Sequence, residues 1–422
     1  MNDDSHSSTR NQETVSPPPR VHRAKWVMMT PDRIIENGAV TVVGNTISRV
    51  EPWGNGSASS SRRVTDHGTG LLMAGAINAH THLDLSALKG RVHGSGTFLS
   101  WVRSLLQERG RMDPEAAESE ALSAARNLCS RGTACVADIG AGPAGIQRLR
   151  QANLCGWFLW EVLGGSPLPR ASLSKPLLNA ASCEPGLSLA GHAPHTTPSE
   201  TLVSAKQRTK EKGLLFSIHL AESEEEAAFI RTGKGEWADF LSERGITLVL
   251  PRTQRDTPVA YANELGLLDE RTLAVHLRLA VWEDLRRLAE ARCNVCICPR
   301  SNMRMYGTMP PVEDMLRAGI RPALGTDSLA SVDDLDVWKE AAFLARQLPN
   351  LSPRDIMAMA TSNGARALGL HSHFGELIPG RRAFMAFLSL DGYTAEDVLE
   401  RAVYGEERKG VKSALGSCSD TL

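Results

Sequence analysis

Short apolar segments alternate with helix-compatible segments between residues 73 and 327, and this alternation restricts the fold more than any other feature. Repeated strand–helix units favour a parallel sheet, and eight such units favour a closed barrel over an open sheet. An open doubly wound sheet is the alternative, but no Gly-x-Gly-x-x-Gly motif follows an early strand. We therefore predict an α/β fold with a (β/α)8 TIM-like barrel. The predicted strands are the run that ends at His80 and residues 132–138, 156–163, 186–192, 214–219, 272–276, 295–298 and 321–327.

The two ends of the chain follow a different pattern. Residues 1–22 are almost entirely polar, which predicts a disordered leader. Residues 23–72 contain short apolar stretches separated by turn residues, as in a small antiparallel β unit, and a β pattern returns at 375–392. Pairing of these segments would build one small β-sandwich domain from both ends of the chain, beside a barrel of residues 73–374. A helix and a polar tail are predicted at 393–422.

The composition is that of an ordinary soluble globular protein, with 42% hydrophobic and 23% charged residues. A net charge of -1 and a pI near 6.9 give no support for nucleic acid or an anionic membrane as a partner. No window approaches the roughly 18 uninterrupted apolar residues that a membrane span needs. We therefore expect a small molecule as the partner, while a homodimer is an oligomeric state that the sequence leaves open.

The cysteines indicate a reducing compartment. Eight cysteines in 422 residues do not make a disulfide framework, and no charged segment followed by an apolar stretch opens the chain, so we expect the cytoplasm. Cys293, Cys296 and Cys298 have spacings that suggest zinc, but they stand in an apolar run without a second Cys or His cluster to complete a site. We interpret them as small buried strand residues.

His80 and His82 end the first predicted barrel strand. Alternate side chains of a strand share a face, so these two imidazoles can bind one metal ion. A bare His-x-His is short enough to arise by accident, but His219, His276 and Asp327 each follow their own apolar run. Barrel enzymes place their chemistry at the carboxyl ends of the strands. The pattern therefore predicts a metal site at that end of the barrel.

Several motifs together resemble the amidohydrolase superfamily, in its cytosine deaminase and chlorohydrolase-like branch. The similarity runs from about residue 22 to about residue 392. Its motifs are His80-Thr-His82, His219-Leu-Ala-Glu222, the strand that ends at His276, Cys298-Pro-Arg-Ser-Asn302 and Gly325-Thr-Asp327-Ser328.

Within this branch, further segments most resemble the aminodeoxyfutalosine deaminases, which act in a menaquinone pathway. These segments are 101–106, Phe158-Leu-Trp-Glu-Val-Leu-Gly164, Gly191-His-Ala-Pro-His-Thr-Thr197, and Thr257-Pro-Val-Ala-Tyr261 before Gly266. The resemblance implies a hydrolytic deaminase of an aminopurine nucleoside, most of all aminodeoxyfutalosine. Relatives take adenosine, methylthioadenosine or S-adenosylhomocysteine.

Deamination requires a hydroxide at neutral pH, which a divalent metal supplies by lowering the pKa of bound water from 15.7 towards about 7. The proposed ligands are His80, His82, His219 and Asp327. Three neutral nitrogens and one oxygen suit zinc or iron(II), with one position left for water. Binuclear members of the superfamily bridge two metals with a modified lysine on the fourth strand, and residues 187–192 contain no lysine, so we expect one metal ion.

The resemblance also implies roles for neighbouring side chains. Glu222 would shuttle a proton to the ring nitrogen, although an acid that opens a helix is its ordinary interpretation. Glu224, Glu225 and Glu226 are interpreted as a solvated first turn. His276 would hold the water or the tetrahedral intermediate, and Asp327 would both bind metal and accept the proton of the water.

Substrate contacts are predicted at three positions. His192 ends the fourth strand and is assigned to the substrate by resemblance, and His195 is left as a supporting residue. Trp101 could form a stacking wall and Glu108 could bind ribose hydroxyls, although helix-core and solvated-face roles fit them equally. Arg300 and Asn302 could face the opening or serve an ordinary loop.

Two segments depart from the pattern of the family, and two alternative functions remain open. Relatives frequently carry Cys and a second His where this chain has Leu277-Arg278-Leu279, which puts the exact substrate in doubt. The segment 382–384 departs from the usual Asp-Ala-Asp in the closing β segment. Hydrolysis of another C–N or C–Cl bond on a heteroaromatic ring would use the same centre. A catalytically silent, metal-stabilised scaffold needs only the ligands, and Glu222 and His276 would have no role in it.

Overall fold

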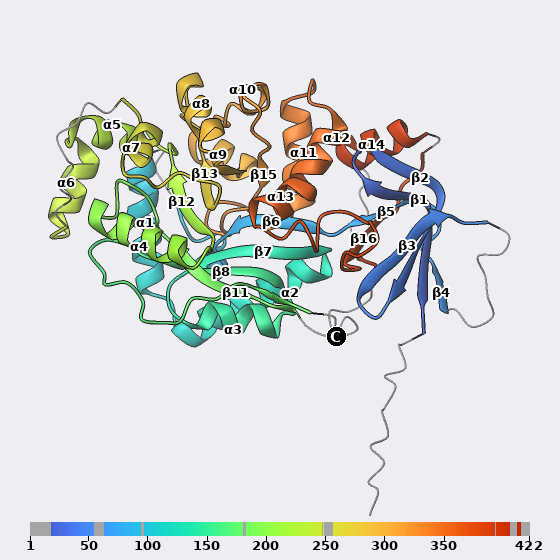
Figure 1. Ribbon diagram of the computed structural model, residues 1–422. Helices are drawn as coiled ribbons and strands as arrows, with labels where there is room; N and C mark the ends of the chain where they lie inside the picture. Colours follow the sequence, from blue (N-terminus) through green and yellow to red (C-terminus); the bar gives the residue numbers. More distant parts are fainter. Residues whose placement is uncertain are drawn as a thin grey trace, which may run out of the picture.

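The computed structural model describes residues 18–54, 63–93, 97–179, 183–246, 248, 256–392, 394–405 and 412–414. Eight parallel strands form one sheet in the order β15-β14-β13-β12-β11-β8-β7-β6 (Figure 1). Their bounds are β6 Ala76–Thr81, β7 Thr133–Gly140, β8 Cys155–Glu161, β11 Gly186–Ala190, β12 Phe216–Leu220, β13 Thr272–His276, β14 Asn294–Ile297 and β15 Ala323–Leu324. All eight predicted strands are therefore present.

The first and last strands meet and nearly close the barrel. A parallel bridge joins Thr81 to Asp327, and the backbone N–H of Thr326 donates to the carbonyl of His80 over 2.9 Å. The eighth strand is shorter than its apolar run of 321–327 because Pro322 has no N–H to donate and Asp327 turns into the left-handed region with φ 58°. The TIM-like barrel of the sequence prediction is confirmed, and the open sheet is not observed.

Helices lie outside the strands on both sides of the barrel (Figure 1). Several begin where the sequence provides a cap: Thr97 and Asp113 each accept a backbone hydrogen bond at the start of a predicted helix. The helices are η1 Leu83–Leu88, α1 Phe98–Gly110, α2 Pro114–Ser130, α3 Ala144–Gln151, α4 Ser199–Glu211, α5 Glu224–Thr232, α6 Glu236–Glu243, α7 Pro258–Glu264, α8 Trp282–Glu290, α9 Pro299–Tyr306, α10 Val312–Arg317, α11 Val337–Gln347, α12 Pro353–Ala360, α13 Ser362–Ala367 and α14 Ala395–Tyr404. Within the described residues, no helix is both long and apolar enough to cross a membrane.

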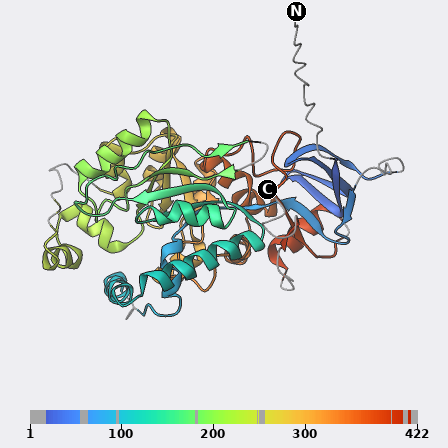
Figure 2. The same ribbon diagram turned by 90° about the horizontal axis from the view of Figure 1, so that it is seen from below.

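A second sheet stands at one end of the barrel (Figure 2). It runs β17-β16-β5-β1-β2-β3, with β4 paired to β1. Both chain ends contribute to it, since β16 pairs with β5 in antiparallel register, as the sequence suggested. The bounds are β1 Arg20–Thr30, β2 Arg33–Val43, β3 Thr46–Pro52, β4 Arg63–Asp66, β5 Leu71–Ala74, β16 Met385–Leu388 and β17 Lys412–Ser413. A short hairpin of β9 Leu177–Leu178 and β10 Cys183–Glu184 lies apart.

Two details of this domain differ from the sequence prediction. The sheet is mixed rather than antiparallel, because β1 pairs in parallel with both β4 and β5. Strand β1 begins at Arg20, so residues 20–22 belong to the sheet, whereas residues 1–17 of the predicted leader lie outside the described residues. The predicted carboxyl-terminal helix is present as α14.

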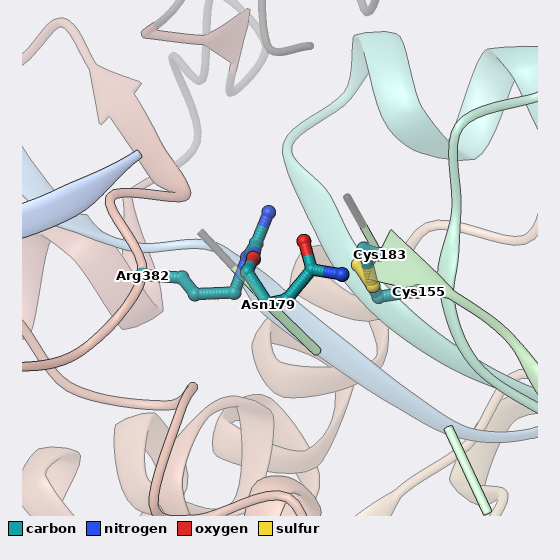
Figure 3. The surroundings of a disulfide bond; sticks show 4 residues. All are labelled: Cys155, Asn179, Cys183 and Arg382. Carbon is teal, nitrogen blue, oxygen red and sulfur yellow. A yellow bond between two sulfur atoms is a disulfide. The ribbon is translucent and has the colours of Figure 1, made fainter. Parts of the chain in front are cut away.

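The cysteines divide into two groups. Cys293, Cys296 and Cys298 are buried and free, as interpreted from the sequence. Cys155 of β8 is joined to Cys183 of β10 by a disulfide (Figure 3), a pairing that the sequence analysis did not anticipate. Beside it, the guanidinium of Arg382 donates to the backbone carbonyl of Asn179 over 2.5 Å. Arg382, in the segment 382–384 noted above, thus links the closing segment of the small domain to the hairpin of β9 and β10.

Candidate metal centre and active site

Four side chains from three separate strand ends converge at one point of the barrel. His80 lies in β6 with His82 directly after it, His219 lies in β12, and Asp327 follows β15. The Nε2 atom of His219 is 3.3 Å from Nε2 of His80 and 3.2 Å from Nε2 of His82. Oδ1 of Asp327 is 3.7 Å from Nε2 of His80 and 3.8 Å from Nε2 of His82. The predicted ligands therefore form one cluster.

The spacing of these atoms fits a single small metal ion. Ligands about 2.0–2.1 Å from a tetrahedral ion lie roughly 3.3 Å apart, close to the distances in the cluster. Nδ1 of His219 donates to the carbonyl of His192 over 3.1 Å, which leaves Nε2 as the bare nitrogen. Burial lowers the pKa of His80 to about 3, so its imidazole is neutral at pH 7. Neutral imidazoles beside a carboxylate are the donor set that zinc and iron(II) accept.

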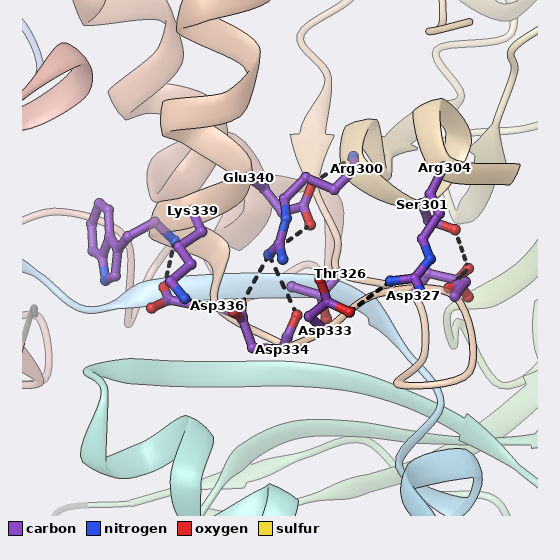
Figure 4. A network of polar contacts seen from close by, with 12 residues as sticks. Arg300, Ser301, Arg304, Thr326, Asp327, Asp333, Asp334, Asp336, Lys339 and Glu340 are labelled. Carbon is purple, nitrogen blue, oxygen red and sulfur yellow. Dashed lines mark hydrogen bonds and ion pairs between the residues drawn. The ribbon is translucent and has the colours of Figure 1, made fainter. Parts of the chain in front are cut away.

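Asp327 is held from behind by two hydroxyl groups. Ser301 donates to its Oδ2 over 2.6 Å (Figure 4), and Ser331 donates to the same atom over 2.7 Å. Burial alone would raise the pKa of Asp327, but the nearby imidazoles of His80, His276 and His82 lower it below its ordinary value. Asp327 is therefore ionised at neutral pH, with Oδ1 facing the imidazoles.

Glu222 and His276 lie beside each other at this cluster. Oε1 of Glu222 is 3.6 Å from Nε2 of His276, whose ring centroid lies 5.3 Å from that of His219. The amide of Asn302 donates to Nδ1 of His276 over 3.2 Å, so the proton of the neutral imidazole resides on Nε2. Asn302 therefore supports His276, a role that the sequence analysis did not consider.

Arg300, the neighbour of Asn302 in sequence, points into a separate polar network. Its guanidinium pairs with Asp334 over 2.9 Å, and its backbone N–H donates to buried Glu340 over 2.9 Å (Figure 4). Burial raises the pKa of Glu340 to about 8. Arg300 thus has a structural partner at both its side chain and its backbone, which fits the ordinary loop role.

Of the three residues assigned to substrate, one lies near the proposed ligands and two lie on α1. His192 is near the centre, with its ring centroid 5.1 Å from that of His219 and its Nδ1 2.6 Å from Oγ1 of Thr196. Trp101 lies on α1 and packs against the small core of Leu85, Leu88 and Ala330, whereas Glu108 near the end of α1 pairs with Arg111 over 2.7 Å. The contacts of all three with substrate remain predictions.

Three features of the site escaped the sequence analysis. Glu226 is not part of a solvated turn but fully buried, because its carboxylate accepts from the backbone N–H groups of Ala221 and Glu222. Tyr306 donates to Glu222 over 3.1 Å. Glu161, at the end of β8, has a buried Oε1 that lacks a hydrogen-bond partner within the described residues, and burial raises its pKa to about 7. The sequence did offer a signal for Glu161, since it is an acidic residue at the end of the apolar strand in the segment 158–164.

Comparison with known proteins places the cluster in a family. Residues 71–414 match the sequence model of the amidohydrolase family. The chain belongs to this family. This amidohydrolase is 30% identical over 362 residues to the aminodeoxyfutalosine deaminase of Deinococcus radiodurans, and the aligned region covers 80% of this chain and 82% of the relative. It is 29% identical over 373 residues to the 5-methylthioadenosine/S-adenosylhomocysteine deaminase of Moorella thermoacetica, and here the aligned region covers 85% of this chain and 82% of the relative.

A solved structure shows the same fold. The adenosine deaminase of Xanthomonas campestris with bound zinc has a TM-score of 0.74 at 22% identity and covers 95% of this chain and 94% of its own. The family and the two relatives confirm the predicted superfamily and the prediction that this amidohydrolase is a hydrolytic deaminase. The alternative of a catalytically silent scaffold is not favoured by either relative.

Proposed function

We propose that this amidohydrolase removes the amino group of an aminopurine nucleoside by hydrolysis and that aminodeoxyfutalosine is its substrate. One observation carries the proposal: the four atoms that we propose as metal ligands lie beside the carboxylate of Glu222 and the imidazole of His276. A purely structural metal site requires only its ligands. The extra acid–base pair has a use only in a reaction.

The reaction adds water to the ring carbon that bears the amino group and releases ammonia. One divalent metal ion, zinc or iron(II), held by His80, His82, His219 and Asp327 would supply hydroxide at neutral pH. Asp327, ionised and oriented by two serine hydroxyls, accepts the proton of the attacking water. Glu222 takes the other proton of the water and delivers it to the ring nitrogen, and Nε2–H of His276 donates to the oxygen that adds to the ring. The proton held by Asp327 passes to the amino group, which leaves as ammonia.

The choice of substrate follows the relatives. The Deinococcus relative favours aminodeoxyfutalosine, and that substrate would place the chain in menaquinone biosynthesis. The Moorella relative, at almost equal identity, favours methylthioadenosine or S-adenosylhomocysteine as the second candidate. A single metal ion is proposed because the fourth strand, β11 with the two residues after it, contains no lysine.

A substrate panel tests the proposal. Ammonia release is measured with aminodeoxyfutalosine, adenosine, methylthioadenosine and S-adenosylhomocysteine, and chloride release is measured with a chlorotriazine, before and after metal removal. We expect the highest kcat/KM with aminodeoxyfutalosine and loss of turnover in the metal-free protein, restored by zinc or iron(II). Turnover of the chlorotriazine alone, or of no aminopurine by the metal-loaded protein, would overturn the substrate assignment.

The role of Glu222 is tested separately. Glu222→Gln keeps the shape of the side chain but cannot move a proton, so we expect kcat to fall roughly 10²–10⁴-fold with metal content unchanged. Glu211→Gln makes the same chemical change at the exposed end of α4 and should leave kcat unaltered. A Glu222→Gln protein with full kcat would remove Glu222 from the mechanism.

A further inference from the structure

Arg278 is buried directly behind Glu222, in the segment Leu277-Arg278-Leu279 that the sequence analysis singled out. It follows β13, and its side chain is 3% exposed. Its Nε donates to the backbone carbonyl of Glu222 over 2.7 Å, and Nη1 donates to Oγ1 of Thr308 over 2.8 Å. Nη2 donates to Glu224, whose carboxylate offsets the buried positive charge. Arg278 is thereby fixed in one place by three partners.

Tyr306 connects Arg278 to the carboxylate of Glu222. It is the last residue of α9, and its ring lies under the Arg278 guanidinium, whose carbon is 4.3 Å from the ring centroid. Its hydroxyl donates to Oε1 of Glu222 over 3.1 Å. A cation against the ring face attracts the π electrons and holds the ring in place. Burial and the neighbouring Glu222 raise the pKa of Tyr306 well above its ordinary value, so the hydroxyl keeps its proton to donate.

The two oxygens of Glu222 are consequently unequal. Oε1 is occupied by Tyr306 and faces Nε2 of His276, whereas Oε2 has no hydrogen-bond partner within the part of the chain that the structure describes. The backbone on either side is also fixed, since the N–H of Glu222 donates to Glu226 over 2.7 Å and its carbonyl accepts from Arg278. The segment therefore presents one free carboxylate oxygen in a fixed orientation.

We propose that Tyr306, held by Arg278, is a positioning residue that orients Glu222 so that Oε2 exchanges the proton with the substrate. The inference rests on the proposed function, because it assigns Tyr306 to the proton transfer by Glu222. The hydroxyl of Tyr306 donates to Glu222, and within the described residues no hydrogen bond joins Tyr306 to a proposed metal ligand. A free carboxylate would instead rotate among several rotamers, and few of them would face the ring nitrogen.

Kinetics of Tyr306→Phe test the proposal. Loss of one hydrogen bond to an ionised group is expected to lower kcat roughly 10- to 100-fold, while KM stays within about two-fold and metal content is unchanged. Tyr404→Phe removes the same hydroxyl from α14, where it donates to backbone carbonyls, and should keep the kcat of the wild type. Arg278→Met should lower kcat in the same direction, since the ring loses its support.

The decisive comparison uses a Glu222→Gln background. If Tyr306 acts through Glu222, Tyr306→Phe causes no further loss of kcat in Glu222→Gln protein; an equal loss in both backgrounds would overturn the proposal. A crystal structure of Tyr306→Phe gives a second readout, in which the Glu222 carboxylate is expected to leave its place beside His276. An unmoved carboxylate with full kcat would also overturn it. If the wild-type protein turns over no aminopurine, the proposed function fails, and the crystal structure still decides whether Tyr306 holds Glu222.

Discussion

Removing the hydroxyl of Ser331 or Ser301 is expected to weaken metal binding without any change to a ligand. Both side chains are 1% exposed, and both donate to Oδ2 of Asp327, over 2.7 and 2.6 Å. These bonds fix the rotation of the carboxylate so that Oδ1 faces His80 and His82. In Ser331→Ala or Ser301→Ala, one of two anchors is lost and the carboxylate gains freedom to rotate.

The magnitude follows from the number of anchors. Loss of a partner that orients a metal ligand typically costs about 10–100-fold in affinity, or roughly 1.4–2.7 kcal/mol. One anchor remains in each single variant, so we expect the lower end, about 10-fold in Kd. The double variant Ser301→Ala/Ser331→Ala should approach about 100-fold, with some non-additivity because both hydroxyls share one acceptor. An opposing effect exists, since a carboxylate without these donors is a stronger ligand, but a freely rotating ligand must be ordered on binding.

Metal affinity is measured by competition with a chromophoric chelator for zinc and, without oxygen, for iron(II). Ser130→Ala is the matched control, because its hydroxyl donates to the carbonyl of Asn127 at an exposed helix end far along the chain from the ligands. Thermal unfolding of the metal-free variants checks that the fold is kept. If both single variants and the double variant bind zinc as tightly as the wild type, or more tightly, the reasoning about orientation is refuted.

Other contacts lead to separate expected outcomes. Arg148→Met leaves the fully buried carboxylate of Asp138 without its cationic partner at 3.2 Å, so the free energy of unfolding should fall by about 3–5 kcal/mol at pH 8 in urea titrations. An unchanged midpoint would contradict this. Burial raises the pKa of Asp138 from 3.8 to about 7, so the folded state binds the proton more tightly than the unfolded chain. Protonation of Asp138 therefore adds to the free energy of unfolding, fully below pH 4, and this contribution is lost as pH rises through 7. The same titrations should show that decline in the wild type and a weaker one in Asp138→Asn. Chelation of the metal should lower Tm, because a metal present at 1,000 times its Kd adds about 4 kcal/mol to the free energy of unfolding. A Tm that does not change on chelation would contradict a metal bound by the folded state.

The strand-borne part of the site was predictable because it depends on short-range periodicity. His80 and His82 share a face by the two-residue repeat of a strand, and His219 and Asp327 follow apolar runs. A parallel barrel brings the carboxyl ends of all its strands to one face. Position along each strand was therefore enough to predict the meeting of side chains such as His82 and His219, which are 137 residues apart.

The supporting residues were not predictable because their partners are distant in sequence. Glu226 stands in an acidic run that the helix dipole alone would explain, and only the packing of α5 against the end of β12 buries it under two backbone N–H groups. Arg278 was recognised as a departure, but nothing local connects it to Tyr306. The mixed sheet likewise depends on which strands become neighbours: β1 pairs in parallel with β5, a choice made by tertiary packing rather than by the pattern of either strand.

Backbone conformation identifies the site independently of any motif. Among the described residues other than glycine, eight have a positive φ, and five of these lie at strand ends around the metal cluster: His192, Ala221, His276, Leu277 and Asp327. Such conformations cost of order 1–3 kcal/mol each and persist only where the surrounding structure enforces them. Here the enforcing contacts are visible, since the carbonyl of His192 accepts from His219 over 2.7 Å and the N–H of Asp327 donates to His80 over 3.1 Å. These backbone bonds thus hold the strained residues at the strand ends, so the strain and the proposed metal site share one end of the fold.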